Sequence, residues 1–138
     1  MTAAQARIII DGGKAAGKAL VLGAPISFWG GVDPKTGTII DVRHPEHGAG
    51  TAGTVLFVPA TAGSSTASTI LLELVHVGRA PAAIVLHEPD AILLLGLVAA
   101  REMGLAVPPA LALDRALHGQ FAGKTVTVED GTIRTSSG

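Results

Sequence analysis

The turn Gly63-Ser64-Ser65-Thr66 places three hydroxyl side chains between an apolar segment typical of a strand and a segment with helical spacing. At such a turn the free backbone N–H groups and the positive end of the helix dipole point at one spot, which favours an anion. One serine can cap the helix, and the hydroxyl of its neighbour is then spare for chemistry. The spacing alone favours the simpler interpretation, in which both serines only cap and satisfy the turn.

The segment 25–37 is the second place that could contact a ligand. It holds the single tryptophan, Trp29, beside Phe28, followed by Gly30 and Gly31. Two glycines let the backbone approach a ligand closely, and paired aromatic rings in a chain with 3% aromatic residues indicate a lid or a contact surface. A turn in which Trp29 closes one end of the core explains the same residues equally well.

Five histidines raise the question of a metal site, and their spacing argues against one. His44 and His47 lie in a loop with Pro and Glu, and no H-E-x-x-H pattern occurs. His76 is expected in the last turn of a helix, where a cation favours the dipole. The chain has no cysteine, hence no thiolate nucleophile and no cysteine-held zinc or iron–sulfur cluster. We therefore predict that this chain itself binds no metal.

The composition excludes several classes of function. Ten Lys and Arg stand against eleven Asp and Glu, for a net charge of -1, so nucleic acid is not an expected partner. With 48% hydrophobic and only 15% charged residues, the chain is expected to have a covered face. Its most apolar stretch, 91–100, is about half of the roughly twenty residues that a membrane helix needs. Without a secretory signal either, we expect a cytoplasmic protein that does not contact a membrane.

The elements that must position these residues are short, because eighteen glycines and eight prolines interrupt the chain. Segments that are β-branched or alternate between apolar and polar residues predict strands. They are 8–10, 18–22, 38–42, 54–58, 83–86, 105–107, 124–129 and 132–135. Asp130-Gly131 between the last two predicts a two-residue hairpin turn, since both residues tolerate positive φ.

Two segments carry apolar residues at helical spacing. The first predicts a helix over 66–77 that ends at Gly78, and the second predicts a helix capped by Asp90 that ends before Gly104. The second has so little polar face that we expect it to be buried on most sides. Together these elements predict one domain over residues 1–138, of mixed α/β class, with a small mixed β-sheet or barrel flanked by helices.

Several motifs, taken in order, resemble one family. They are Ser27-Phe28-Trp29-Gly30-Gly31-Val32-Asp33-Pro34 with Thr36-Gly37, then His44-Pro45, then Pro59 ahead of Gly63-Ser64-Ser65, and then Gly78-Arg79-Ala80-Pro81. Over roughly 17–107 they resemble the aconitase X small subunit, or swivel domain. The resemblance implies a swivelling β/β/α domain that docks on a larger catalytic subunit. That subunit would hold the substrate and an iron or iron–sulfur centre.

The resemblance also implies an activity, the dehydration of a small hydroxy acid by a hydro-lyase. Aconitase is similar in using a Gly-Ser-Ser turn whose first serine acts as base, and the matching position here is Ser64. Aconitase has an arginine after the two serines, where this chain has Thr66. The substrate carboxylate must therefore be bound elsewhere, with Arg43 and the larger subunit as candidates.

Further residues are expected around the substrate. The substrate-binding candidates are Ser65, Gly30, Gly31, Asp33, Arg43 and His44. We expect the surface around Trp29, Gly30, Gly31 and Ser64 to face the larger subunit, because a catalytic turn needs a cover that excludes water.

The favoured substrate is cis-3-hydroxy-L-proline, because the alanine-rich composition is typical of bacteria. The small subunit of a phosphomevalonate dehydratase is the alternative with the same chemistry. A swivelling phosphohistidine carrier would need a histidine at the turn, whereas His76 lies about three helical turns later. A non-catalytic binding module would tolerate replacement of both serines.

Overall fold

The computed structural model describes residues 2–63 and 65–136 of the 138-residue chain. These residues form an eight-stranded mixed sheet with strand order β1-β8-β7-β3-β4-β5-β6-β2. The strands are β1 (Ala3–Gln5), β2 (Arg7–Ile10), β3 (Ala15–Val21), β4 (Val55–Val58), β5 (Ala83–Leu86), β6 (Ala110–Ala112), β7 (Thr125–Glu129) and β8 (Thr132–Thr135). The strands β3, β4, β5 and β6 pair in parallel, and the other pairs are antiparallel.

The sheet curls towards a barrel. Its two edge strands, β1 and β2, are separated in sequence by Ala6 alone, yet β1 pairs with β8 and β2 pairs with β6. The Ala6 amide donates to the Gly131 carbonyl at 2.7 Å and holds this junction against the β7–β8 turn. A mixed α/β fold with a barrel-like sheet is therefore confirmed.

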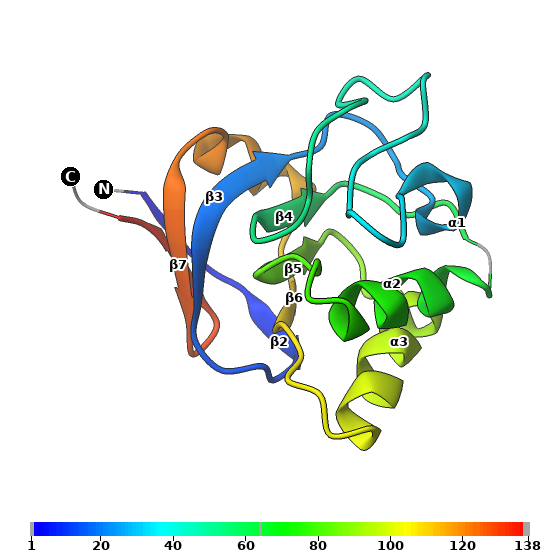
Figure 1. Cartoon of the computed structure of the whole chain (residues 1–138). Coiled ribbons are helices and arrows are strands. Elements are labelled where there is room, and N and C mark those ends of the chain that lie inside the picture. Colours follow the sequence, from blue (N-terminus) through cyan, green and yellow to red (C-terminus); the bar gives the residue numbers. More distant parts are fainter. Residues whose placement is uncertain (1, 64, 137–138) are drawn as a thin grey trace.

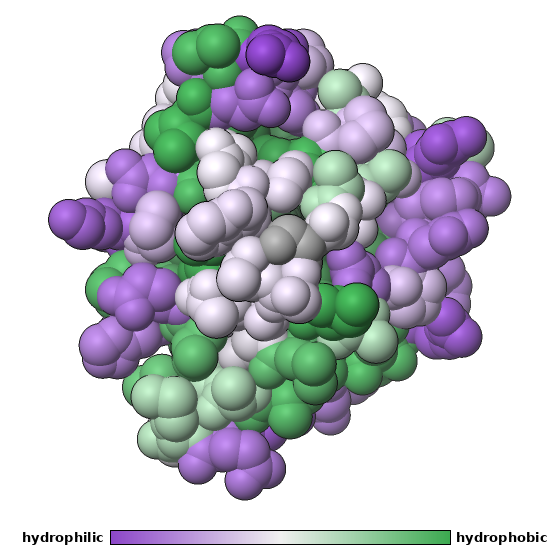
Figure 2. Space-filling model, turned by 90° about the vertical axis from the view of Figure 1, so that its right-hand side faces the viewer, coloured by the Kyte–Doolittle hydropathy of each residue, from purple (hydrophilic) through white to green (hydrophobic). Residues whose placement is uncertain are grey.

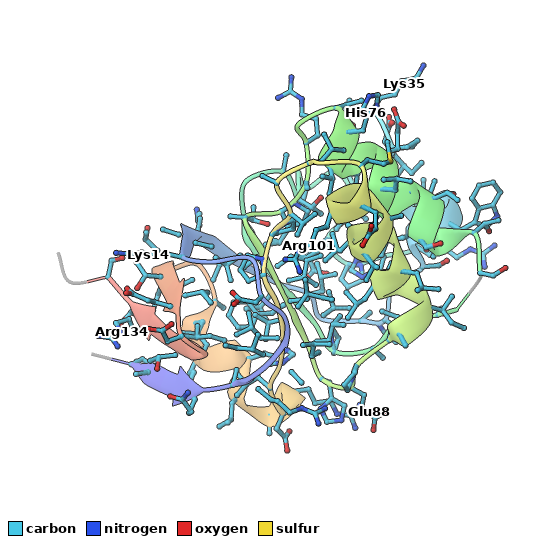
Figure 3. All side chains as sticks on the ribbon, turned by 90° about the horizontal axis from the view of Figure 1, so that it is seen from below. Lys14, Lys35, His76, Glu88, Arg101 and Arg134 are labelled. Carbon is cyan, nitrogen blue, oxygen red and sulfur yellow. The ribbon has the colours of Figure 1, made fainter. Side chains whose placement is uncertain are left out.

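Helices cover one side of the parallel strands, as Figure 1 shows. They are α1 (Phe28–Gly31), α2 (Ala67–His76) and α3 (Ala91–Glu102), and two short 3₁₀ turns, η1 (Arg115–Leu117) and η2 (Gly119–Phe121), precede β7. The Asp90 carboxylate accepts from the Leu93 amide at 3.0 Å and caps α3, as predicted. At the other end of α3, Arg101 donates to the Asp11 carbonyl (Figure 3).

Two hydrophobic cores lie on opposite faces of β4 and β5. In β4, Leu56 and Val58 pack with the apolar side chains of α2 and α3, whereas Val55 and Phe57 pack into the curl of the sheet. All four residues of each of these strands are buried. This two-sided burial explains why the strands read as unbroken apolar runs rather than as an alternation.

The predicted hairpin is confirmed. Asp130 and Gly131 have φ of 50° and 80°, and Glu129 pairs with Thr132 across the turn. Positive φ at both central residues is the geometry that follows the right-handed twist of the flanking strands.

Two predicted strands are wrong. Residues 38–42 make only isolated bridges in a loop, because Asp41 starts a turn in which the His44 amide donates to the Asp41 carbonyl. Residues 105–107 complete the end of α3, where the Leu105 amide donates to the Ala100 carbonyl. The strand begins instead at Ala110, after Pro108 and Pro109, which have no amide proton for the pairing.

The predicted burial of the second helix on most sides is also wrong. One side of α3 packs into the core through Leu93, Leu97 and Ala100, whereas Leu95 and Val98 are exposed. The helix looked apolar all round in the sequence because these exposed positions also hold aliphatic residues.

Candidate functional site

The candidate site lies at the carboxyl ends of the parallel strands. The segments that follow β3, β4 and β5 all leave the sheet at this edge, where ligands of open α/β sheets bind. The chain after β3 pairs with the chain after β4, since the Ile26 amide donates to the Ala60 carbonyl and the Ala62 amide donates to the Ile26 carbonyl. This pairing brings the segment that contains Trp29 beside the turn that precedes α2 (Figure 1).

The predicted base, Ser64, lies outside the described residues. Its neighbours Gly63 and Ser65 are exposed, and α2 begins at Ala67 with Thr66 in the N-cap position. Thr66, rather than Ser65, therefore takes the N-cap position. The Ser65 carbonyl accepts from the Ser68 hydroxyl at 3.0 Å, which fixes the backbone of the turn.

The aromatic segment turns one ring inward and the other outward. Phe28 is 1% exposed and belongs to the core, whereas Trp29 is 55% exposed. Gly30 has a φ of 80°, which L side chains rarely adopt, and Gly31 is buried. The interpretation that Trp29 closes the core is wrong, because Phe28 fills that place.

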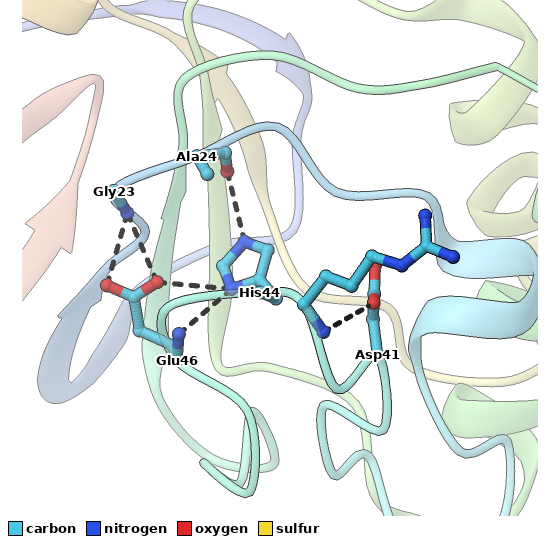
Figure 4. A network of polar contacts seen from close by, with 6 residues as sticks. Gly23, Ala24, Asp41, His44 and Glu46 are labelled. Carbon is cyan, nitrogen blue, oxygen red and sulfur yellow. Dashed lines mark hydrogen bonds and ion pairs between the residues drawn. The ribbon is translucent and has the colours of Figure 1, made fainter.

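His44 holds a loop in place. It is buried, its Nε2 donates to the Ala24 carbonyl at 3.1 Å, and its Nδ1 accepts from the Glu46 amide at 3.0 Å. The Glu46 carboxylate also accepts from the Gly23 amide, as Figure 4 shows. These contacts attach the loop 41–50 to the chain that leaves β3, and they use both ring nitrogens.

Asp33 and Arg43 differ in how far they can reach a ligand. The Asp33 carboxylate accepts from the Lys35 amide at 2.8 Å and stabilises its own turn. Arg43 is exposed, and its backbone amide donates to the Asp41 carboxylate. Among the described residues its guanidinium contacts no hydrogen-bond or ion-pair partner, so it is available to an anion. The structure thus leaves Gly30, Ser65 and Arg43 at the surface, whereas the half-buried Asp33 and the buried His44 make hydrogen bonds that hold their loops.

A pocket of about 600 Å³ opens at the ends of β4 and β5. The Thr61 hydroxyl on its wall donates to the Asp90 carboxylate at 2.7 Å. His87 accepts at Nδ1 from the Arg115 amide at 3.0 Å, so the neutral ring carries its proton on Nε2. Our sequence analysis missed this pocket. The signal that could have indicated it is the polar run after β5, where His87, Glu88 and Asp90 follow a buried strand.

The donor set of this chain does not fit an iron centre. No cysteine occurs in the sequence, and within 2–63 and 65–136 no three His, Asp or Glu side chains gather closely enough to hold a metal ion. In the same described part, no helix is long and apolar enough to cross a membrane.

The described residues define a mixed α/β domain with a candidate site at the carboxyl edge of its sheet, and comparison with known proteins identifies the family. The aconitase X swivel domain matches residues 3–135, so this chain belongs to the aconitase X swivel domain family. The resemblance that the motifs indicated is thereby confirmed.

Relatives occur as separate small subunits and as parts of longer proteins. The phosphomevalonate dehydratase small subunit of Thermococcus gammatolerans is 32% identical over 94% of this chain and 95% of its own length. Cis-3-hydroxy-L-proline dehydratase of Pseudomonas aeruginosa is 47% identical over 75% of this chain. The chain spans only about a fifth of the length of the cis-3-hydroxy-L-proline dehydratases that it matches.

Two solved structures share the fold. The crystal structure of Thermococcus kodakaraensis aconitase X in its holo-form superposes with a TM-score of 0.82 at 28% identity. It covers 99% of this chain and 100% of the matched chain. The solution structure of a UPF0107 protein gives a TM-score of 0.83 at 29% identity, with the same coverage.

Proposed function

We propose that this chain is the small, swivelling subunit of an aconitase X type dehydratase and that it acts only with a larger subunit. The observation that carries the proposal is the nearly end-to-end match to a small subunit, 94% of this chain and 95% of the relative. The phosphohistidine carrier is disfavoured, because His76 lies in the last turn of α2 instead of in the turn that precedes the helix.

In this proposal the turn before α2 supplies the base for the dehydration. In a dehydration a base takes a proton from carbon, the freed electron pair forms the double bond, and the hydroxyl leaves the neighbouring carbon as water. We assign the base to Ser64. A serine hydroxyl is a weak base, so its alkoxide needs the amides at the start of α2 and positive charge from the larger subunit.

The substrate is a small hydroxy acid that binds around the same turn. We keep Ser65 and the Gly30-Gly31 backbone as contacts, with Arg43 as a cation for the substrate anion. Asp33 and His44 act by holding their loops. Cis-3-hydroxy-L-proline is the favoured substrate, since the Pseudomonas aeruginosa relative is 47% identical over 104 residues, whereas the phosphomevalonate dehydratase small subunit of Thermococcus sibiricus is 44% identical over 91 residues. Mevalonate 5-phosphate is the alternative.

The iron or iron–sulfur centre belongs to the larger subunit in this proposal, because the donors of this chain do not fit it. The chain purified alone should therefore retain no stoichiometric iron after chelator treatment and should turn over neither substrate. Iron held by the chelated chain in a one-to-one ratio would contradict this division between the subunits.

The test of the proposed function is copurification of the tagged chain with a larger, cysteine-bearing subunit from its source cells, followed by turnover assays. We expect the complex to release water from cis-3-hydroxy-L-proline faster than from mevalonate 5-phosphate. The reverse order would identify the alternative substrate. A stable complex that dehydrates neither compound would overturn the assignment, and double replacement of Ser64 and Ser65 without loss of turnover would favour a binding module.

A further inference from the structure

The outer side of α3 is apolar although it packs against nothing in the part of the chain that the structure describes. Ile92, Leu95 and Val98 are 54%, 57% and 44% exposed, and their spacing places them on one side of the helix. The opposite side is already occupied by the core. A helix that is apolar on both sides is expected where a second surface covers it.

The charged residues of α3 lie at its C-terminal end, beyond the last residue of this stripe. Arg101 and Glu102 stand at the end of the helix, and Arg101 reaches back to the Asp11 carbonyl. Figure 3 shows the labelled polar side chains His76, Glu88 and Lys14 pointing outward at widely separated places on the molecule. The stripe of Ile92, Leu95 and Val98 therefore contains no charge that covering would desolvate.

The stripe continues the surface around the catalytic turn. Ile92 lines the pocket at the ends of β4 and β5, and so does Thr61, three residues before Ser64 in the chain. In Figure 2 a hydrophobic region over α3 adjoins the pale, weakly polar centre of the same face, and strongly polar residues lie to either side. One partner could cover both regions together.

We propose that the α3 stripe docks on an apolar surface of the larger subunit and fixes the orientation of the turn that carries Ser64. This inference rests on the proposed function. A relative indicates the size of the partner: in the Pseudomonas aeruginosa protein, about four-fifths of the polypeptide lies outside the segment that matches this chain. A second copy of this chain on the stripe is the alternative occupant that the test must separate from the larger subunit.

Docking is tested by chemical labelling, which the absence of cysteine makes selective. Leu95→Cys introduces a single thiol into the stripe, and Ile8→Cys places one at a comparably exposed position, 45%, on β2. Labelling with a maleimide is measured from the increase in mass of this chain. We expect labelling of Leu95→Cys to slow at least about tenfold in the complex, as for a side chain in an interface core. Labelling of Ile8→Cys should change by less than about twofold. Equal labelling of Leu95→Cys in the free and the bound chain would overturn the proposal.

A charge at the same position tests how much the stripe contributes to binding of the larger subunit. Leu95→Glu should weaken binding to the larger subunit by at least about tenfold, whereas Ile8→Glu should stay within about twofold of the wild type. Both variants should unfold at nearly the wild-type temperature, since both positions are exposed. Should Leu95→Glu fail to fold, Val98→Gln and the labelling experiment decide the question.

The other outcomes separate the two proposals. A free chain that is a dimer, and that Leu95→Glu converts to a monomer without weakening the complex, would assign the stripe to a second copy and overturn the docking. A complex that Leu95→Glu disrupts but that dehydrates neither substrate would retain the docking and overturn the proposed function.

Discussion

At the scale of single residues, a buried residue of the core is often followed directly in the sequence by a residue that is exposed or lines the pocket. In the segment after β3, the Phe28 ring fills the core and the Trp29 ring is exposed. After β5, His87 and Asp90 face a pocket, while the preceding residue, Leu86, is buried. The functional surface is thus built from residues that directly follow buried ones, so the rigid sheet positions them.

The two aromatic neighbours should respond oppositely to truncation. Phe28→Ala should lower the free energy of unfolding by about 3–5 kcal/mol, because it leaves a cavity in the core. Trp29→Ala should change it little and should instead weaken assembly or turnover of the complex. Thermal unfolding of the isolated variants and copurification with the larger subunit measure the two effects. A large loss of stability in Trp29→Ala would restore the role of this ring as a core residue.

His118 makes stability depend on pH. Burial lowers its pKa from the ordinary value of 6.5 and outweighs the Leu113 carbonyl, which raises the pKa; smaller effects come from His87, which lowers it, and Asp114, which raises it. Its Nε2 donates to the Leu113 carbonyl at 2.8 Å, and its buried Nδ1 has no partner among the described residues. His118 therefore binds a proton more readily in the unfolded chain than in the folded chain.

The sign follows from proton linkage. The contribution of His118 to the free energy of unfolding is constant above about pH 6.5. As the pH decreases below that value, the contribution decreases by at most about 1.4 kcal/mol per pH unit. Denaturant unfolding between pH 7.5 and 5 should show this fall, and His118→Gln, which keeps an N–H donor, should reduce it. The exposed His76→Gln serves as control. An unchanged slope in His118→Gln would mean that another group causes the pH dependence.

At the scale of elements, the crossing of α2 and α3 depends on one glycine. A Cβ at Gly96 would lie 2.3 Å from the Ser68 carbonyl oxygen, so the two helices could not keep their separation. Gly96→Ala should therefore destabilise the chain by about 1–3 kcal/mol, despite the better helix propensity of alanine.

The matched control is Gly119→Ala, because a Cβ there meets no atom within 4 Å. We expect its unfolding temperature to be unchanged or slightly raised. Gly96→Ala with wild-type stability would show that the helices separate without cost, and the α3 stripe would then not be held rigidly enough to orient the turn.

The sequence predicted those elements whose local chemistry decides their conformation. Asp130-Gly131 and the cap at Asp90 carry their own turn and capping groups, and both predictions are confirmed. Residues 105–107 and the exposed side of α3 could not be predicted in this way. Apolar side chains look the same in the sequence whether the core of this chain or another surface covers them.

The sequence predicted where the candidate site lies better than it predicted which side chains are exposed there. The motifs indicated the edge where Trp29 and the turn 63–66 lie, and the pairing at Ile26 brings these two segments together. Hydrogen bonds between distant residues decide the rest. His44 is buried against Ala24, twenty residues earlier in the chain, which no local pattern reveals.

At the scale of the whole molecule, the fold presents the turn that we propose to be catalytic at one edge of a curled sheet and leaves an apolar helix face beside it (Figures 1 and 2). One partner that covers both would exclude water from the turn as it docks, which strengthens every charge interaction at the base. In the proposed function the small subunit supplies the base and the larger one holds the iron centre, since the donors in the described part of this chain do not fit a metal.

The central claim is that the hydroxyl of Ser64 removes the proton from carbon, and deuterium exchange in the assembled complex tests it most directly. With substrate in D₂O, the wild-type complex should incorporate deuterium at the carbon that loses its proton. The Ser64→Ala complex should bind substrate with a similar KM yet lower both exchange and kcat by at least about 10²-fold. Ser65→Ala should retain exchange. Exchange at the wild-type rate in Ser64→Ala, or a loss confined to Ser65→Ala, would contradict the assignment.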